Sequence, residues 1–188
     1  MQAVALAPLI ALMLAAAVHA QGVGQAQAID AAVLAHIASR PAAQRIGLVN
    51  AAVNRFEHRA DAPAGAIDEW LAPAQLRERG YGDCEDFAIA KFAALRALGM
   101  PDDRLRLAYG RLRVGGATQP HMVALVDDGS GRLLVLDSTS DTVLSVQERA
   151  DLHIVFSFNR DTTWDGAGQR RVQPRQPLRR WVAIAGQL

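Results

Sequence analysis

The first twenty residues of the chain contain no Asp, Glu, Lys or Arg. Residues 3–18 are almost wholly apolar, and Val18-His19-Ala20 fits a small-x-small cleavage site before Gln21. We therefore expect residues 1–20 to be a signal peptide that is removed on export. The alternative is an uncleaved membrane anchor, for which the apolar run is slightly short. No other stretch of the sequence is apolar enough to span a bilayer.

The sequence also contains only one cysteine, Cys84. A lone cysteine excludes an internal disulfide, although exported proteins usually use cysteines in such pairs. It is either a small buried apolar residue or a reactive thiol. The surroundings of Cys84 therefore matter most for function.

Neither sign of charge is in large excess. The 20 basic and 19 acidic residues leave a formal net charge of +1, whereas nucleic-acid binding normally requires a strongly basic face. Nucleic acid is therefore not an expected partner. Apolar residues make up 51% of the chain, a composition typical of a globular domain.

Acidic residues are missing from the end of the chain. Residues 166–188 carry five arginines and two prolines but no Asp or Glu. We expect this segment to be a poorly ordered Arg/Pro-rich tail. The remaining residues, 21–165, are expected to form one domain.

The pattern of apolar residues predicts helices in the first half of the domain and strands in the second. Helical periodicity is found in residues 28–39, 42–58, 74–79 and 84–98. Strands are indicated at residues 104–114, 121–126, 132–137 and 152–158. Helices followed by an antiparallel sheet are typical of an α+β fold.

Cys84 lies in the first turn of the predicted helix 84–98, directly after a segment that Gly80 and Gly82 end. The unpaired N–H groups and the positive end of the helix dipole favour a thiolate at this position. Position alone leaves a structural cysteine and a reactive thiol equally open, because unpaired cysteines are commonly buried.

Three carboxylates surround this cysteine: Asp83, Glu85 and Asp86. Their negative charge raises a thiol pKa. Acids are common in the first turn of a helix, and Asp83 can serve as the N-cap. Alternatively, some of them hold a hard cation such as Ca²⁺, which takes oxygen ligands. By itself the residue pattern favours helix capping.

A histidine and an aspartate mark the ends of a predicted hairpin further along the chain. Pairing Val126 with Arg132 places His121 directly opposite Asp137 on one face of the sheet. An aspartate so placed can accept the ring N–H and fix the tautomer of the histidine. Taken singly, a surface histidine and a strand-ending aspartate are the simpler interpretations; with Cys84 they form a plausible nucleophile, base and orienting group.

Other kinds of site find no support in the sequence. No group of His and Cys residues has the spacing of a zinc site, and no Gly-rich loop has the pattern of a phosphate-binding loop.

Cysteine at a helix start, followed by His and Asp on successive strands, is the transglutaminase-like order. Five segments resemble the bacterial transglutaminase-like cysteine peptidases of the LapG type: residues 68–73, 81–91, 121–123, 135–137 and 156–159. The similarity runs from about residue 49 to residue 164. Its most specific block is Gly-Asp-Cys-Glu-Asp at 82–86.

The resemblance implies a papain/transglutaminase-like core and a cysteine peptidase with Cys84 as nucleophile, His121 as base and Asp137 as orienting group. Members of the family act in the periplasm of Gram-negative bacteria. They clip large surface adhesins near the N-terminus, and this controls biofilm attachment. An inner-membrane receptor for cyclic di-GMP sequesters the protease. We expect the enzyme itself to be a monomer.

The resemblance also implies calcium dependence, with Asp83 and Glu85 as ligands and Asp68 as a weaker candidate. Three positions depart from the family pattern, and they leave substrate and receptor preference open: Glu69, Leu71 and Ser138.

Two other functions would use the same residues. A transglutaminase-type acyl transferase would pass the acyl group to an amine instead of water. A non-catalytic module would bind a peptide through the same groove. A purely structural role explains the lone Cys84 but not the matched His121 and Asp137.

Overall fold

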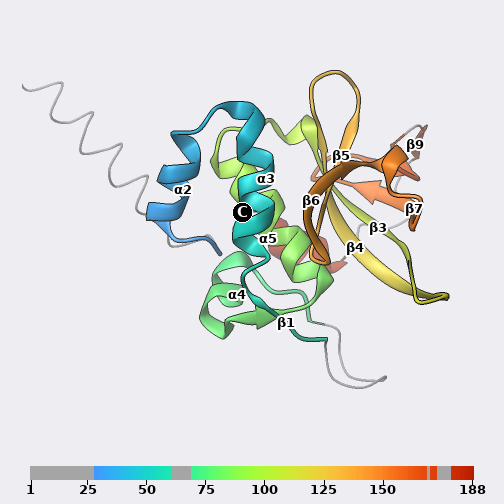
Figure 1. Ribbon diagram of the computed structural model, residues 1–188, viewed down its shortest axis with the longest axis horizontal. Helices are drawn as coiled ribbons and strands as arrows, with labels where there is room; N and C mark the ends of the chain where they lie inside the picture. The colour runs from blue at the N-terminus through green and yellow to red at the C-terminus, as the bar shows by residue number, and fades with distance from the viewer. Residues whose placement is uncertain (1–27, 61–68, 169, 173–178) are drawn as a thin grey trace, which may run out of the picture.

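The computed structural model describes residues 28–60, 69–168, 170–172 and 179–188 (Figure 1). The expected signal peptide, residues 1–20, lies outside the described residues, and so does the candidate calcium ligand Asp68. Within the described part of the chain, no helix has both the length and the apolar character needed to cross a membrane.

Helices come mainly from the first half of the chain, as predicted. In the described residues the α-helices are α2 (Ala31–Ala38), α3 (Ala42–Val53), α4 (Pro73–Arg79), α5 (Cys84–Ala97) and α6 (Arg179–Ala185). Two short 3₁₀ helices are η1 (Asp102–Arg104) and η2 (Val146–Glu148).

Most of the strands form one antiparallel sheet, in the order β6-β5-β4-β3-β7-β8-β9. They are β3 (Leu105–Val114), β4 (Ala117–Asp127), β5 (Leu133–Asp137), β6 (Ser140–Ser145), β7 (Leu152–Phe158), β8 (Thr163–Asp165) and β9 (Arg170–Val172). A separate parallel pair consists of β1 (Glu57–His58) and β2 (Tyr81–Gly82). The α+β prediction is therefore confirmed.

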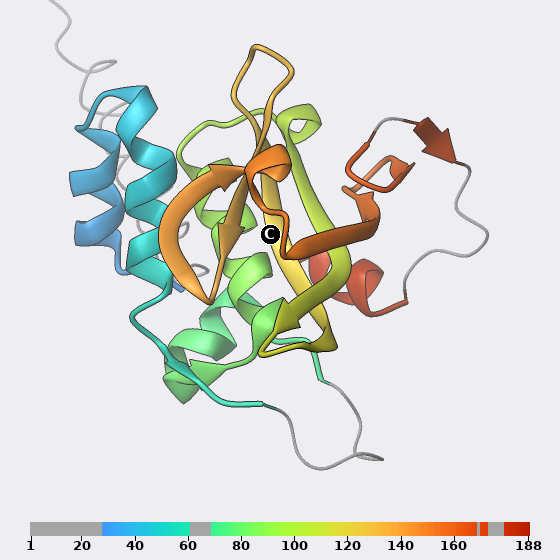
Figure 2. The same cartoon turned by 45° about the vertical axis from the view of Figure 1, so that its right-hand side comes forward.

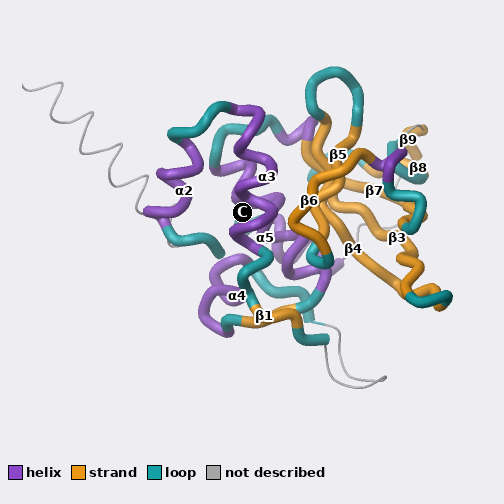
Figure 3. The backbone as a smooth tube through the Cα atoms, in the orientation of Figure 1, coloured by secondary structure: helices purple, strands orange, loops and turns teal. Residues whose placement is uncertain are grey.

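Helix α5 is the centre of the molecule. It packs against β3, β4 and β5 on one side and against α3 and α4 on the other. Figure 1 and Figure 3 show helices α2 to α5 gathered on one side of the sheet. In the turned view of Figure 2 the sheet curves, and its edge strand β6 comes to lie beside α3. The helix that begins at Cys84 is thus enclosed by other elements.

Strand β4 is buried on both faces, so its apolar residues form a continuous run instead of alternating with polar ones. Met122, Ala124 and Val126 belong to the main core, which includes the helices. Val123 and Leu125 belong to a second core cluster on the opposite face of the sheet. The strand that carries His121 is therefore fixed by packing on both sides.

The hairpin of β4 and β5 forms, but its predicted register is wrong by two residues. Val126 pairs with Leu134 and not with Arg132. Strand β4 continues through Asp127, whose carboxylate accepts the N–H groups of Gly129 and Gly131 at 2.8 and 3.2 Å and shapes the loop. A shift of two residues leaves each side chain on its predicted face, because side chains in a strand alternate with period two.

Helix α3 ends earlier than predicted. The expected helix over residues 42–58 stops at Val53, and the chain then extends so that β1 can pair with β2. The N–H of Arg59 donates to the carbonyl of Gly82 at 2.8 Å. This pairing of segments distant in sequence outweighs the local helical pattern, and it joins α3 to the turn before Cys84.

The expectation of a poorly ordered tail is wrong for the end of the chain. Residues Arg179–Ala185 form helix α6, and Trp181 is buried in the main core. The Trp181 ring packs edge-on against Phe92 and Phe158, at 5.5 and 5.7 Å between ring centroids. Its indole N–H donates to the carbonyl of Asn159. The aromatic contacts attach α6 to both α5 and β7.

Replacement of Trp181 by alanine is expected to destabilise the whole domain. Removing a buried aromatic ring lowers the free energy of unfolding by about 3–5 kcal/mol, which urea denaturation followed by circular dichroism would measure. The neighbouring Val182 is 57% exposed, so Val182→Ala is the matched control and should change stability by no more than about 0.5 kcal/mol. Equal stability of the two variants would show that α6 is not part of the core.

Candidate active site

Cys84 is the first residue of helix α5, and the sequence before it builds a sharp helix start. Helix α4 ends at Gly80, whose φ of 75° suits glycine. Asp83 then takes the N-cap position of α5, and its backbone N–H donates to the Asp86 carboxylate at 3.2 Å. The prediction that Cys84 lies in the first helical turn is confirmed.

Asp86 has a structural task in this turn. It is 2% exposed, and its second carboxylate oxygen accepts the backbone N–H of Leu71 at 2.7 Å. The carboxylate lies so close to Gly82 that a Cβ there would come within 2.6 Å of it. Glycine is therefore required at position 82, and the Gly-Asp-Cys-Glu-Asp block is a packed unit that holds the cysteine at the helix end.

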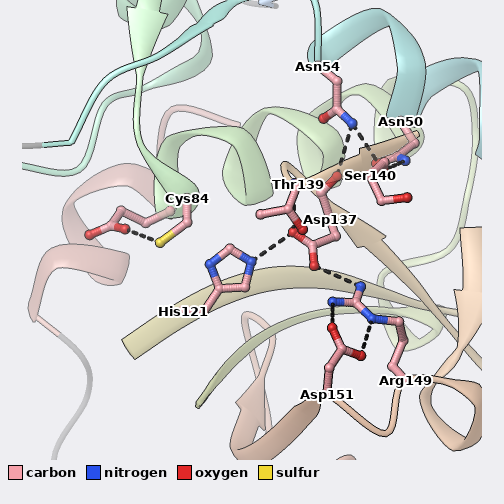
Figure 4. Close-up of polar contacts among 10 residues, drawn as sticks. Asn50, Asn54, Cys84, His121, Asp137, Thr139, Ser140, Arg149 and Asp151 are labelled. Atoms are coloured by element: carbon pink, nitrogen blue, oxygen red, sulfur yellow. Dashed lines mark hydrogen bonds and ion pairs between the residues drawn. The ribbon is translucent and has the colours of Figure 1, made fainter. Parts of the chain in front are cut away.

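His121 and Asp137 form a buried pair on strands β4 and β5. The His121 Nε2 atom lies 2.7 Å from Asp137 Oδ1, and the two side chains are 3% and 0% exposed. Figure 4 shows the imidazole between the two other groups, with its second ring nitrogen, Nδ1, on the side of Cys84. The structure thus brings Cys84, His121 and Asp137 together, as the sequence predicted.

Several donors surround the Asp137 carboxylate. Besides His121, the backbone N–H of Thr139 donates to it at 2.9 Å, and the Arg149 guanidinium lies 2.7 Å from its second oxygen. Burial by itself raises the pKa of Asp137, but the hydrogen bonds and positive charge from His121, then Thr139 and Arg149, hold that pKa well below its usual range. Asp137 is therefore an anion throughout the neutral range.

Arg149 is itself fixed in place. Its guanidinium makes two 2.9 Å contacts with the carboxylate of Asp151, and its side chain is 8% exposed (Figure 4). An arginine and a carboxylate that are joined by two parallel hydrogen bonds have a fixed relative orientation. A chain of hydrogen bonds and ion pairs therefore runs from His121 through Asp137 and Arg149 to Asp151.

Asn50 of helix α3 and Asn54, the residue that caps its C-terminus, hold the backbone next to Asp137. The Asn54 amide donates to the carbonyl of Asp137 at 3.0 Å and to the carboxylate of Asp141 at 2.9 Å. The Asn50 amide donates to the carbonyl of Ser140 at 2.8 Å. Sequence reasoning missed Arg149, Asn50 and Asn54. The asparagines at positions 50 and 54, one turn apart in the mostly apolar segment 46–54, were the available signal for these two residues.

The thiol of Cys84 has a partner that does not activate it. Its Sγ donates to Glu85 Oε2 at 2.9 Å (Figure 4). Burial raises the pKa of Cys84 far above its ordinary value, and the charge and hydrogen bond of Glu85 add to this rise, with a further contribution from Asp83. The backbone N–H of Met122 acts in the opposite direction. Positive charge near Glu85 would therefore favour the thiolate.

The family resemblance implies that the acids flanking Cys84 are calcium ligands. Within residues 28–60, 69–168, 170–172 and 179–188, no group of three or more His, Cys, Asp or Glu side chains is arranged to hold a metal. Asp83 and Glu85 nevertheless provide two hard oxygen ligands beside Cys84, which fit the preference of Ca²⁺. A cation there would offset the negative charge that raises the pKa of Cys84.

A thiol at a helix start, an imidazole beside it and a buried carboxylate behind the imidazole are the groups of a cysteine peptidase. The fold and this site define a transglutaminase-like cysteine peptidase. The chain matches the model of the bacterial transglutaminase-like cysteine proteinases over residues 23–165, and it belongs to that family.

Solved structures support the same assignment. Calcium-bound LapG from Legionella pneumophila has a TM-score of 0.72 and 32% sequence identity with this chain, over 83% of this chain and 85% of LapG. EGTA-treated LapG from the same organism has a TM-score of 0.72 and 30% identity, over 84% and 86% of the two chains. A comparison with curated protein sequences gave no match. The expected transglutaminase-like fold is therefore confirmed.

Replacement of Arg149 by methionine is expected to cost both stability and activity. The change leaves the buried Asp137 charge without the guanidinium that pairs with it at 2.7 Å, and breaking a buried ion pair costs about 3–5 kcal/mol. Because the pKa of Asp137 is lowered in the folded protein, its stabilising contribution is present at neutral pH and is lost as acid protonates it. The loss caused by Arg149→Met should thus be larger at pH 7 than at pH 3, as urea denaturation would measure.

The matched control for this prediction is Arg132→Met. Arg132 is 56% exposed and pairs with Asp128 in the hairpin loop, so its replacement should change stability by less than about 1 kcal/mol. Equal effects of the two substitutions would contradict a special role for Arg149.

Proposed function

We propose that this cysteine peptidase is a calcium-dependent periplasmic endopeptidase that cleaves a large surface adhesin near its N-terminus. The observation that supports the chemistry best is the position of His121, whose ring lies between Cys84 and the buried carboxylate of Asp137 (Figure 4). In this proposal Cys84 is the nucleophile, His121 the general base and acid, and Asp137 the orienting group.

The first half of the reaction forms an acyl-enzyme. His121 Nδ1 takes the proton of Cys84 Sγ, and the thiolate attacks the carbonyl carbon of the peptide bond. The Cys84 backbone N–H, at the positive end of α5, is suited to stabilise the oxyanion. His121 then gives its proton to the leaving amine while the C–N bond breaks, which leaves a thioester on Cys84.

The second half of the reaction hydrolyses the thioester. His121 takes a proton from water while the water oxygen attacks the thioester carbonyl. The C–S bond then breaks, the carboxyl product leaves, and His121 returns the proton to Cys84 Sγ. During both halves the Asp137 anion stabilises the positive charge on His121 and keeps Nε2 protonated, so that Nδ1 is the nitrogen that exchanges protons.

Calcium has an electrostatic and structural part in this proposal. Asp83 and Glu85 would hold the ion, and Asp68 remains a candidate third ligand. A bound cation would supply positive charge beside Glu85, which accepts the hydrogen bond of the Cys84 thiol. It would have no direct part in bond making. The calcium-bound and EGTA-treated forms of LapG support this part of the proposal.

The substrate, partner and location follow from the family resemblance. We propose a large surface adhesin as the substrate, with biofilm attachment as the process under control. An inner-membrane receptor for cyclic di-GMP is the proposed regulator, and the periplasm is the proposed location. The enzyme is proposed to act as a monomer.

Cleavage of an adhesin fragment tests this function directly. The N-terminal region of a large adhesin from the same genome should be cut by the wild-type protein in calcium and not in EGTA. The Cys84→Ala variant should not cut it in either condition, because the nucleophile is missing. Gel electrophoresis and mass spectrometry of the products would measure the cleavage. Turnover by Cys84→Ala would contradict the catalytic proposal, and amide formation with an added primary amine would indicate an acyl transferase.

Alkylation of Cys84 tests the role of calcium without any adhesin. Iodoacetamide reacts with the thiolate, and this chain has no other cysteine. The wild-type protein should react faster in calcium than in EGTA at pH 7. In EGTA, Glu85→Gln should react faster than the wild type, because the amide lacks the charge that raises the pKa of Cys84. Mass spectrometry at timed intervals would give the rates.

A glutamate away from the thiol provides the control for this experiment. Glu78 is exposed on helix α4, so Glu78→Gln should behave as the wild type in both solutions. Equal alkylation of the wild type and Glu85→Gln in EGTA would show that Glu85 does not restrain the thiol.

A further inference from the structure

The chain contains 19 arginines but only one lysine, Lys91. This lysine lies in helix α5, seven positions after Cys84, which corresponds to about two helical turns. Its side chain is 0% exposed. Every other basic position is an arginine, so the single residue of this type stands at a buried position behind the active site.

The charged end of Lys91 has no conventional partner. Its Nζ forms no hydrogen bond within the part of the chain that the structure describes. The ring of Phe87, one turn earlier on the same helix, has its centroid 5.8 Å from Nζ. A buried ammonium group with three donors and no acceptor is costly. Such a group is retained at a cost in stability, which points to a role other than stabilising the fold.

The surroundings of Lys91 are complementary to it. The negative charges that act on it are those of Asp137 on β5 and Asp141 on β6. Helix α3, which packs against α5, contributes the neutral Asn50 and ends at the neutral Asn54. Asn54 donates to both Asp137 and Asp141, so it approaches the same two residues as Lys91.

The two asparagines also have unused hydrogen-bond acceptors, which Lys91 lacks as partners. Their NH₂ groups donate to backbone carbonyls of the turn after β5. Their amide oxygens, Asn50 Oδ1 and Asn54 Oδ1, are buried and accept no hydrogen bond in the described residues. The buried oxygens of Asn50 and Asn54 and the buried Nζ of Lys91 thus all lack partners in the described residues, and the two helices α3 and α5 pack against each other.

We propose that Lys91 is a positioning residue of the active site: its ammonium group, with Asn50 and Asn54, holds the turn Asp137–Asp141 from the helix side, and this keeps Asp137 aligned on His121. Arg149 holds the same carboxylate from the other side. The inference rests on the roles proposed above for Asp137 and His121.

A lysine at this position makes the arrangement sensitive to pH. Burial lowers the pKa of Lys91 to about 7, although Asp137 and Asp141 act against this shift. Lys91 is therefore charged below neutral pH and increasingly neutral above it. An arginine would keep its charge throughout. The hold on the turn weakens as the pH rises through the neutral range.

The variant Lys91→Met tests the proposal, because methionine fills a similar volume without charge. In excess calcium, Cys84 of the variant should be alkylated by iodoacetamide about tenfold more slowly than the wild type at pH 6, and within about twofold of it at pH 8.5, where Lys91 of the wild type is itself largely neutral. This assay needs no adhesin, so an error in the proposed substrate would not affect it.

The melting temperature separates positioning from simple stabilisation. The unfolded chain binds the Lys91 proton more tightly than the folded one, so the buried charge costs stability below neutral pH and less as the pH rises towards the ordinary lysine value. Lys91→Met should therefore melt at a higher temperature than the wild type at pH 6. Leu95→Met, one turn further along α5 and also buried, is the control and should leave the alkylation rate unchanged.

Each outcome decides the question. Slower alkylation at pH 6 with an unchanged or raised melting temperature supports the proposal. Equal rates overturn it, as does a rate deficit that is the same at both pH values or that comes with a lower melting temperature. If Lys91→Met does not fold, NMR of the wild type labelled with ¹³C-lysine replaces the variant, because the single lysine gives a single side-chain signal. A signal that titrates only above pH 9 overturns the proposal.

Discussion

The buried negative charge of Asp137 is the interaction on which the structure of the active site depends. A carboxylate with 0% exposure requires partners on every side. Strand β4 supplies His121, the turn after β5 supplies the Thr139 N–H, and the residue after η2 supplies Arg149. The catalytic geometry therefore depends on all of these elements of the sheet being in place.

Helix α5 connects this charge to the nucleophile. Its first residue is Cys84, and its third, Asp86, fixes the turn in front of the cysteine. Its outer face packs against α3, and Asn54 at the C-terminal end of α3 contacts the backbone of Asp137. One helix thus sets the thiol, the preceding turn and the support for the carboxylate. The position of α5 between α3 and the sheet accounts for the rigidity that such a site needs.

Local patterns were sufficient where an element is defined by its own residues. The helix predicted at 84–98 and the strand at 152–158 agree with α5 and β7, since apolar periodicity is set by the residues of each element. The roles of Arg149 and Asn54, by contrast, arise from contacts between segments far apart in the chain. Strand β6 is similarly defined by its pairing with β5, and α6 by the burial of Trp181. Contacts between distant segments produce no local pattern of apolar residues from which they could be predicted.

The Asp86 carboxylate also has a consequence for sequence variation. It joins the backbone at Leu71 to the backbone at Asp83, so the intervening segment with helix α4 is a loop closed at its base. The entropic cost of closing a loop varies only with the logarithm of its length, so a change in the length of this loop changes the free energy of folding little. Relatives can therefore diverge in the outer part of this loop, and acquire different surfaces beside the nucleophile, without displacing the cysteine.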